Sequence, residues 1–238
     1  AVAFYLAAMG YNVVKHGNRS VSSNCGSADV VEAMGLPFLQ ESGEIMNQLL
    51  KSRFVFLFAP HFHPAFAKIA PVRKELGVRT LFNLLGPLLN PARPTHQLLG
   101  VARKKFVPLM AETLALSGVN RAAVVHGAGG YDELTPFGPS EVMFVQKGRC
   151  EPRVIDPSKY GISTCKEEDL VCSDLKDSLS VMRLLLSGRG PQAMQGMIAL
   201  NLGLALSLLE EDAGLEECMQ RAKEAVSQGL AREVGNAA

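Results

Sequence analysis

Four short runs within the first 125 residues have the length and composition of strands, and two of them, residues 54–58 and 122–125, are apolar throughout. The run at residues 54–58, Phe-Val-Phe-Leu-Phe, is apolar on both faces, as strands of a parallel sheet covered by helices must be. Segments with helical periodicity separate the runs, and this alternation predicts a largely parallel sheet with right-handed crossovers. The predicted strands are residues 11–14, 54–58, 97–101 and 122–125.

Polar residues before apolar segments and glycines after them mark the predicted helices. Ser27 is the expected N-cap of a helix that Gly35 closes, and Ser42 is the expected N-cap of the helix after it. The predicted helices in this half of the chain are residues 27–34, 44–51, 64–76 and 107–116.

The second half of the chain begins with a hairpin and continues as helices. Residues 141–146 and 153–155 flank Lys147-Gly148, which predicts two antiparallel strands joined by a turn. Three helices are expected after them, over residues 179–186, 191–210 and 215–229. The whole pattern predicts an α/β fold with a mainly parallel sheet flanked by helices.

The beginning of the chain lacks the usual signals of a helix start. Residues 1–9 are apolar all round and end at Gly10, but they have no N-cap and no polar first turn. We therefore expect the chain to begin inside a helix of a longer protein. We expect residues 1–238 to form one α/β domain, of which residues 64–94 pack with a small helical lobe whose N-terminal part lies upstream. The prolines and glycines of residues 76–94 make them the expected hinge.

Composition excludes several classes of partner. The formal net charge is +1, which gives no electrostatic reason to expect nucleic acid or an anionic membrane as a partner. The longest apolar runs are too short or too interrupted to span a bilayer. The five cysteines are irregularly spaced, without a Cys-x-x-Cys pair, which indicates free thiols in a reducing compartment and not a zinc site. We expect a cytoplasmic protein, or one of an organelle stroma if the source is a plant or alga.

Asp132 and Glu133 are adjacent in a glycine-rich segment directly after the predicted strand 122–125. In open α/β sheets, ligands bind beyond the carboxyl ends of the strands. Mg²⁺ is usually held by one or two protein carboxylates together with substrate phosphates. The pair is therefore a candidate Mg²⁺ site, although by itself it is also typical of a solvated turn.

A second candidate segment runs from Lys15 to Ser23, after the first predicted strand. It is basic and contains glycine and serines, and Gly26-Ser27 follows it at the start of a predicted helix. Such a loop before a helix N-terminus suits a phosphorylated ligand. Together, the phosphate loop and the carboxylates indicate an enzyme that acts on a magnesium–phosphate substrate.

Four motifs resemble the anthranilate phosphoribosyltransferases: KHGNRSVSS, the following GSAD, HFHPAFAKIAPVRKELGVRTLFNLLGPLLNP, and VVHGAGGYDELTPFG. The resemblance runs in order from Ala1 to about Gly229. It implies a nucleoside phosphorylase/phosphoribosyltransferase-like fold and a homodimer. It also implies Mg²⁺-dependent transfer of phosphoribose from phosphoribosyl pyrophosphate (PRPP) to the amine of anthranilate, in tryptophan biosynthesis. The family's GTGGD loop and nearby N-S-T stretch do not occur in the chain, so we expect residues 1–238 alone to have negligible activity.

The resemblance also implies roles for individual residues. The carboxylates of Asp132 and Glu133 would bind Mg²⁺. Arg73 would bind the anthranilate carboxylate, for which the fork of an arginine is better suited than a lysine. Asn18 would also face anthranilate. Beside the resemblance, His16 and His63 are candidates for lining the same pocket, with a packing role in the core as the alternative. No general base is expected, because the amine of anthranilate is already neutral at pH 7. The residues expected to contact PRPP are Lys15, His16, Gly17, Asn18, Arg19, Ser20, Val21, Ser22, Ser23 and Ser27.

Two alternatives remain open at this point. Pyrimidine-nucleoside phosphorylases have a similar fold, but their phosphate loop differs from KHGNRSVSS. A non-catalytic homologue that binds nucleic acid or a partner protein would be favoured by a basic surface and by loss of the carboxylate pair. The chain has neither property.

Overall fold

The computed structural model describes residues 1–19, 26–65, 69, 75 and 82–230, and the chain divides into two compact units. Both units contain parallel strands with helices packed beside them, which confirms the α/β class. Unit 1 comprises Ala1–Tyr5, Pro94–Val171 and Val181–Gly235, and unit 2 comprises Leu6–Arg93, Cys172–Ser180 and Asn236–Ala238.

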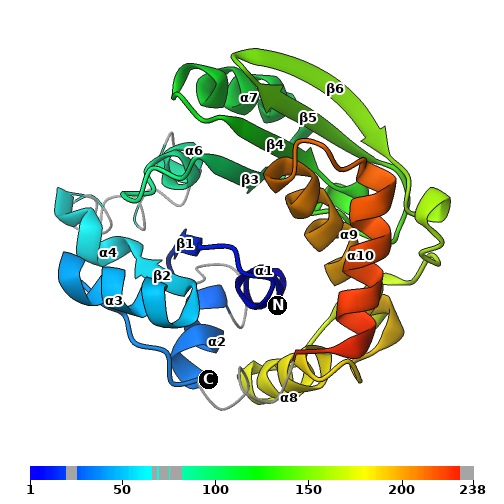
Figure 1. Cartoon of the computed structure of the whole chain (residues 1–238), viewed down its shortest axis with the longest axis horizontal. Coiled ribbons are helices and arrows are strands. Elements are labelled where there is room, and N and C mark those ends of the chain that lie inside the picture. The colour runs from blue at the N-terminus through cyan, green and yellow to red at the C-terminus, as the bar shows by residue number, and fades with distance from the viewer. Residues whose placement is uncertain (20–25, 66–68, 70–74, 76–81, 231–238) are drawn as a thin grey trace. The chain divides into compact units, whose positions relative to one another are not determined.

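Unit 1 is built on a four-stranded sheet in the order β3-β4-β5-β6 (Figure 1). β3 and β4 are parallel, whereas β5 pairs antiparallel with both β4 and β6. The predicted hairpin is confirmed: Lys147 and Gly148 connect β5 to β6, with φ values of 51° and 73° that suit a tight two-residue turn. The strands are β3 (His96–Gly100), β4 (Arg121–His126), β5 (Ser140–Gln146) and β6 (Arg149–Ile155).

Helices cover this sheet. α7 (Val107–Leu116) contacts β4 and β5, and α9 (Gln192–Leu209) contacts β3 and β4. Figure 1 shows the two helices on opposite sides of the sheet. A strand covered on both faces has to be apolar on both faces, which explains the fully buried run at residues 122–125 of β4.

The long helix α9 forms the core of unit 1. By length and composition alone it could cross a membrane, but every residue from Ile198 to Leu208 is buried within the protein. A helix that is apolar all round is what such a core position requires. Its neighbour α10 (Leu215–Gln228) approaches so closely that a Cβ at Gly203 would lie 2.5 Å from the sulfur of Met219.

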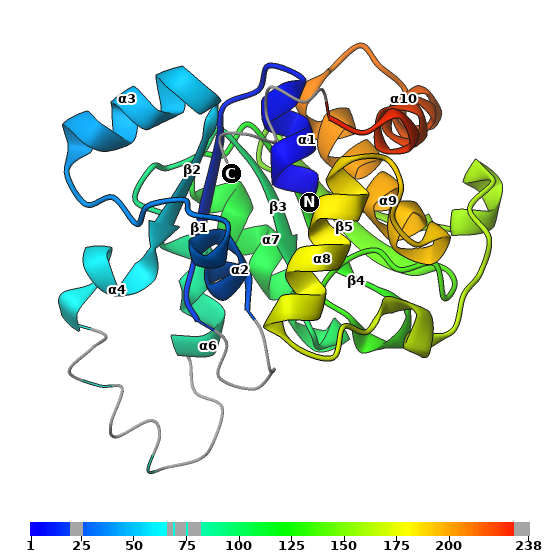
Figure 2. The same ribbon diagram turned by 90° about the horizontal axis from the view of Figure 1, so that it is seen from below.

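Unit 2 contains a two-stranded parallel sheet, in which β1 (Val13–Gly17) pairs with β2 (Phe54–Phe58) along their whole length. The bounds of β2 confirm the predicted strand, and its first four residues are buried. Helices α2, α3 and α4 contact β2 (Figure 2). The helical segments of this unit are α2 (Ser27–Ala33), α3 (Ser42–Ser52), α4 (Ala59–Phe62), α6 (Phe82–Leu85) and the 3₁₀ turn Gly86–Leu88. Two further helices, α1 (Val2–Ala8) and α8 (Leu175–Leu186), have residues in both units.

The first strand lies further along the chain than predicted. β1 covers Val13–Gly17 and not residues 11–14, because each of its residues pairs with one residue of β2. Lys15, His16 and Gly17 therefore lie on a strand, and the following loop begins at Asn18.

Both predicted N-caps were also wrong by one residue. Gly26 is the N-cap of α2, in extended conformation, and its N–H donates a hydrogen bond of 2.9 Å to Asp29 Oδ2. Glu41 caps α3 in the same backbone conformation. Ser27 and Ser42 are the first helical residues, so neither has the extended backbone that a cap requires.

Most of the predicted helix over residues 64–76 lies outside the described residues. The packing of residues 64–94 with a small lobe, and the single-domain assignment, therefore stay predictions.

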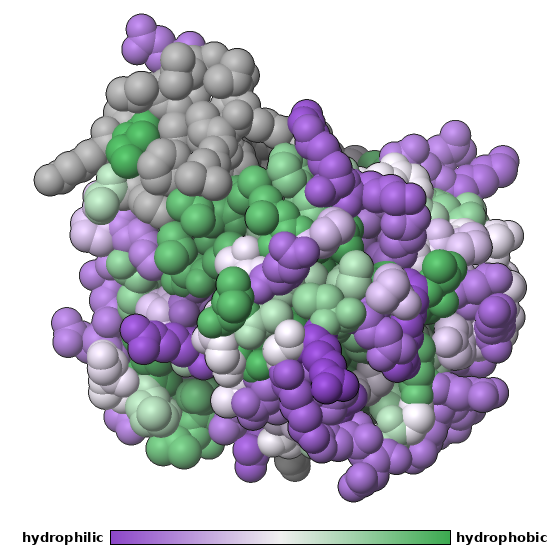
Figure 3. Space-filling view, turned by 90° about the horizontal axis from the view of Figure 1, so that it is seen from above, coloured by the Kyte–Doolittle hydropathy of each residue, from purple (hydrophilic) through white to green (hydrophobic). Residues whose placement is uncertain are grey.

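Large apolar side chains are exposed at scattered positions, among them Leu50 on α3 and Leu116 on α7. Figure 3 shows one face of the molecule, where apolar patches alternate with hydrophilic residues. Scattered exposure of this kind is ordinary for a protein surface, and by itself it indicates no partner.

Candidate active site

Asp132 and Glu133 lie where the sequence predicts, in the loop after β4. β4 ends at His126, a 3₁₀ turn spans Ala128–Gly130, and both carboxylates are exposed. The preceding strand has a parallel neighbour, β3, so the pair stands at the carboxyl end of a parallel strand pair. This is the position at which α/β sheets bind ligands.

Two glycines allow the backbone of this loop to pack tightly. A Cβ at Gly100 would lie 1.6 Å from the carbonyl oxygen of Asp132, and a Cβ at Gly127 would lie 1.9 Å from that of Glu133. The N–H of Gly127 also donates to the Tyr131 carbonyl at 2.8 Å. The ends of β3 and β4 thus hold the two carboxylate residues by their main chain, with no room for a side chain at either glycine.

Asn201 of α9 fixes the residue that follows the pair. Its Oδ1 accepts from the N–H of Leu134 at 2.9 Å, and its Nδ2 donates to the Leu134 carbonyl at 2.8 Å. The same Nδ2 donates to the carbonyl of Met197 at 2.8 Å. The side chain is buried, so both of its polar atoms are satisfied within the core of unit 1. The loop is therefore anchored to the central helix.

Tyr131, the residue directly before the pair, is held in place by its own side chain. Its hydroxyl donates a hydrogen bond of 2.6 Å to Glu167, and its ring meets Phe137 edge-on at 5.4 Å between centroids. The hydrogen bond to the Glu167 carboxylate raises the pKa of Tyr131 to about 12. Tyr131 therefore stays a protonated donor at neutral pH.

The donor chemistry of this loop fits Mg²⁺. Two exposed carboxylates on a rigid loop leave most coordination positions open to water and to phosphate oxygens, as Mg²⁺ prefers. Among the described residues, no group of three or more His, Cys, Asp or Glu side chains could enclose a metal ion. A metal held by Asp132 and Glu133 would accordingly draw further ligands from its substrate.

The basic segment belongs to unit 2, where β1 positions its first residues. Lys15 is exposed on the strand, and His16 and Gly17 are half-buried. Gly17 lies against β2: a Cβ there would be 3.2 Å from the ring of Phe56. The parallel pairing thus fixes the backbone from which the segment continues.

His16 and His63 come together, as expected of residues that line one pocket. Their rings meet edge-on with centroids 5.1 Å apart. Burial, and to a lesser degree the neighbouring His63, lower the pKa of His16, against a hydrogen bond with the Gly86 backbone. Among the described residues, the buried Nε2 atom of His16 has no hydrogen-bond partner. The pair is therefore a buried polar contact within unit 2, with a polar nitrogen that no described residue satisfies.

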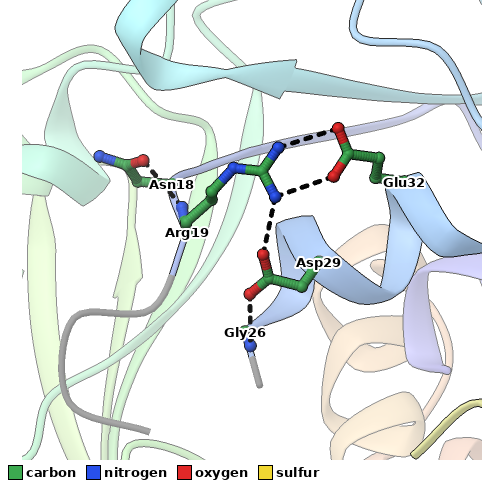
Figure 4. A network of polar contacts seen from close by, with 5 residues as sticks. All are labelled: Asn18, Arg19, Gly26, Asp29 and Glu32. Atoms are coloured by element: carbon green, nitrogen blue, oxygen red, sulfur yellow. Dashed lines mark hydrogen bonds and ion pairs between the residues drawn. The ribbon is translucent and has the colours of Figure 1, made fainter. Parts of the chain in front are cut away.

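Arg19 does not project freely into the loop. Its guanidinium binds Asp29 and Glu32 of α2, at 2.9 Å and 2.8 Å (Figure 4). Its backbone N–H donates to Asn18 Oδ1 at 2.7 Å, so that amide oxygen is engaged within the segment. Ser27 is exposed in the first turn of α2. The predicted site residues Ser20, Val21, Ser22, Ser23 and Arg73 lie outside the described residues.

Comparison with known proteins identifies the family. The profile of the glycosyl transferase family, α/β domain, matches residues 1–232. The chain is 53% identical to the anthranilate phosphoribosyltransferase of Nitratidesulfovibrio vulgaris, over 98% of this chain and 71% of that protein. The chain belongs to the anthranilate phosphoribosyltransferase family. A second member, from Oleidesulfovibrio alaskensis, is also 53% identical, with the same shares of both chains covered.

Solved anthranilate phosphoribosyltransferases have the same fold. The enzyme from Thermus thermophilus matches with a TM-score of 0.88 and 38% identity, over 99% of this chain and 70% of that one. The enzyme from Saccharomyces cerevisiae in complex with PRPP and Mg matches with a TM-score of 0.84 and 25% identity, over 99% and 67%.

Several residues that support the candidate site were not predicted from the sequence. Asn201 left one signal, a polar residue inside an otherwise apolar helix, which often indicates a buried hydrogen-bonding role. Gly100, Asp29 and Glu32 left no signal, because their partners are defined only by the folded chain.

Proposed function

We infer that the protein transfers phosphoribose from PRPP to the amine of anthranilate, giving N-(5-phosphoribosyl)anthranilate and pyrophosphate, with Mg²⁺, in tryptophan biosynthesis. The observation that carries this inference is the carboxylate pair at the carboxyl end of β4, held by main-chain packing in a chain that matches transferases over nearly its whole length. Relatives bound to PRPP and Mg, or to 4-fluoroanthranilate, support the same substrates.

The reaction breaks the bond between the anomeric carbon and pyrophosphate while the anthranilate nitrogen bonds to that carbon. Positive charge develops on the sugar and negative charge on the leaving group, so charge neutralisation and positioning are the main tasks of the protein. Mg²⁺, when bound, neutralises charge on the pyrophosphate oxygens. Asp132 and Glu133 would hold it, and Gly100, Gly127 and Asn201 would keep their backbone in place before substrate arrives.

We assign the PRPP phosphates to the basic segment. Lys15 supplies a point charge from β1, and Gly17 lets the backbone pass close to the ligand. The hydroxyls of Ser22, Ser23 and Ser27 would donate hydrogen bonds to phosphate oxygens. Preorganised donors of this kind stabilise the departing pyrophosphate more than the bound substrate.

We assign anthranilate recognition to Arg73, Asn18 and the histidine pair. Arg73 would bind the carboxylate through two parallel hydrogen bonds. The lowered pKa of His16 favours the neutral ring, which can face an aromatic amine without adding charge. Because the amine is neutral, no residue is assigned as general base.

We further propose that the protein acts as a homodimer in the cytoplasm, or in an organelle stroma in a plant or alga. Small-molecule substrates and a second copy of the chain are the partners in this proposal, with neither nucleic acid nor a membrane. The four described cysteines are free thiols, which supports a reducing compartment. Light scattering after size exclusion tests the dimer, and a single-subunit mass would contradict it.

The function is tested by product analysis of the natural protein. Incubation with PRPP, Mg²⁺ and anthranilate should give N-(5-phosphoribosyl)anthranilate and pyrophosphate in equal amounts. A pyrimidine nucleoside with inorganic phosphate should give no free base. The opposite pattern would assign the protein to the phosphorylases.

A further inference from the structure

Arg19 and Gly26 are the two described residues that border residues 20–25, and one carboxylate contacts both of them. Asp29 Oδ1 accepts from Arg19 Nη1 at 2.9 Å, and Asp29 Oδ2 accepts from the N–H of Gly26 at 2.9 Å (Figure 4). Asp29 lies in the first turn of α2. The end of β1 is thereby joined to the start of α2 through a single side chain.

Glu32, one turn further along α2, completes the contact. Its Oε1 accepts from Arg19 Nη2 at 2.8 Å, and its Oε2 lies 2.8 Å from Nη1. The planar guanidinium is thus bound on its fork by two carboxylates, the geometry for which arginine is suited and lysine is not.

Aromatic rings surround the same guanidinium. Its central carbon lies 5.7 Å from the ring centroid of Phe58, at the end of β2, and 6.0 Å from that of Phe38. The two rings stack on each other, with centroids 4.8 Å apart. Arg19 therefore contacts β2 and the segment before α3 as well as α2.

This environment makes Arg19 a poor phosphate ligand. Two carboxylates more than balance its single charge, so the local field is negative. To bind pyrophosphate with its Nη1–Nη2 fork, the guanidinium would have to leave both partners and expose them to an incoming anion. An arginine used for phosphate binding is expected to keep its fork open instead.

We propose that Arg19 is a positioning residue that, with Asp29 and Glu32, holds the end of β1 against the start of α2 and does not itself bind PRPP. The proposal rests on the proposed function, because it concerns the segment assigned to PRPP. It differs from the role in PRPP contact that the resemblance implies for Arg19. The contacts hold Arg19 and Gly26 in one arrangement before a ligand arrives, which lowers the ordering cost of binding at these two residues.

The direction in which a carboxylate substitution changes the KM for PRPP separates the positioning role from direct PRPP binding. If Arg19 acts through α2, Glu32→Gln and Arg19→Gln should each raise the KM for PRPP by about three- to tenfold, with kcat and the KM for anthranilate within about twofold of wild type. The double variant should be no worse than the worse single variant. Arg19→Lys should recover only part of the loss, because one ammonium cannot replace a fork bound to two carboxylates.

A direct PRPP contact gives the opposite result for Glu32. Removing a carboxylate beside a phosphate-binding arginine would leave the KM for PRPP unchanged or lower it, while Arg19→Gln would still raise it. The proposal would be overturned if Glu32→Gln left the KM for PRPP unchanged or lowered it while Arg19→Gln raised it. It would also be overturned if the two effects added in the double variant, or if neither change had an effect. Glu44→Gln is the matched control: it removes an exposed carboxylate of unit 2 from α3, and it should leave the KM for PRPP unchanged.

Hydrogen exchange separates this proposal from the proposed function. Without substrates, Arg19→Gln and Glu32→Gln should both speed exchange at the Gly26 amide, whose acceptor Asp29 loses its anchor. Unchanged exchange in both variants would contradict the positioning role, whether or not the protein makes the transferase product. If the wild-type protein forms no product while exchange accelerates in both variants, the proposed function fails and the positioning of the segment stands.

Discussion

The two candidate regions are held in place by different kinds of interaction. The Asp132–Glu133 loop is fixed through its backbone, by glycines without room for a Cβ and by the buried amide of Asn201. The described end of the basic segment is fixed through side chains. Arg19, whose side chain is about half exposed, forms ion pairs with two carboxylates of α2. Backbone packing tolerates little change, whereas partly exposed ion pairs are weak and easily rearranged.

The difference suits the two ligands. A small metal ion needs oxygens at fixed positions, so the loop that would hold it gains from rigidity. PRPP is larger and has several phosphate groups, so the residues assigned to it need not be held as tightly as the ligands of a metal ion.

The largest effect is expected where a charged substrate group would lose its partner. In the natural protein, Arg73→Ala should raise the KM for anthranilate, by the equivalent of about 2–5 kcal/mol if the pair is buried, and hardly change the KM for PRPP. Lys15→Ala should do the reverse. Steady-state kinetics with each substrate varied in turn measures both. A rise in both KM values for either variant would show that the two subsites are not separate.

The carboxylate pair should control turnover without controlling stability. Asp132→Asn combined with Glu133→Gln should lower kcat by about a hundredfold, because charge on the leaving pyrophosphate would no longer be neutralised. The melting temperature should hardly change, since both side chains are exposed. Glu211→Gln with Asp212→Asn changes another adjacent, exposed acidic pair of unit 1, and should leave kcat unaltered. A double variant with wild-type rate at saturating Mg²⁺ would reduce Asp132 and Glu133 to a solvated turn.

Stability should depend instead on the anchors of that loop. Gly127→Ala, which places a Cβ against the Glu133 carbonyl, should lower the free energy of unfolding by about 1–3 kcal/mol. Asn201→Leu should cost a similar amount, because it leaves the Leu134 N–H and carbonyl without their partner. Urea denaturation measures both. Gly43→Ala is the control, since a Cβ there meets no atom within 4 Å. Equal stability of all three variants would mean that the loop relaxes freely.

A smaller, pH-dependent effect is expected at His16. Burial lowers its pKa below the ordinary value of 6.5, so the folded state binds its proton less well than the unfolded state. Its contribution to stability is therefore full above pH 6.5 and falls as the pH drops below that value. Denaturation at pH 7.5, 6.5 and 5.5 should show that the free energy of unfolding falls less with decreasing pH for His16→Gln than for wild type. An identical decrease in both proteins would show that His16 does not contribute to the pH dependence of stability.

The sequence allowed good prediction where a pattern is local. β2 and the buried run of β4 were predictable because both faces are apolar, and the carboxylate pair because its residues are adjacent. The end of β1 was not predictable from the sequence, because its pairing with β2 decides where the strand ends. The caps of α2 and α3 depend on backbone conformation one residue earlier than the serines suggest.

Tertiary partners were out of reach of sequence reasoning. Asn201 is 67 residues from Leu134, and no local pattern connects them. The contacts of Arg19 with Asp29 and Glu32, 10 and 13 residues further along, likewise follow no local pattern. Supporting contacts of a candidate site therefore require the folded chain, whereas motifs in the sequence are enough to propose its ligands.

The central claim is that Asp132 and Glu133 bind Mg²⁺ together with the phosphates of PRPP. Measuring metal binding with and without PRPP tests it most directly. With Mn²⁺ as a paramagnetic probe in place of Mg²⁺, electron paramagnetic resonance should show weak binding to the protein alone and much tighter binding when PRPP is added. A metal held by two carboxylates takes its remaining ligands from phosphate oxygens, which is the reason for this difference. The Asp132→Asn, Glu133→Gln double variant should lose the PRPP-dependent increase. Equal Mn²⁺ binding in wild type and double variant with PRPP present would contradict the assignment of the metal to this loop.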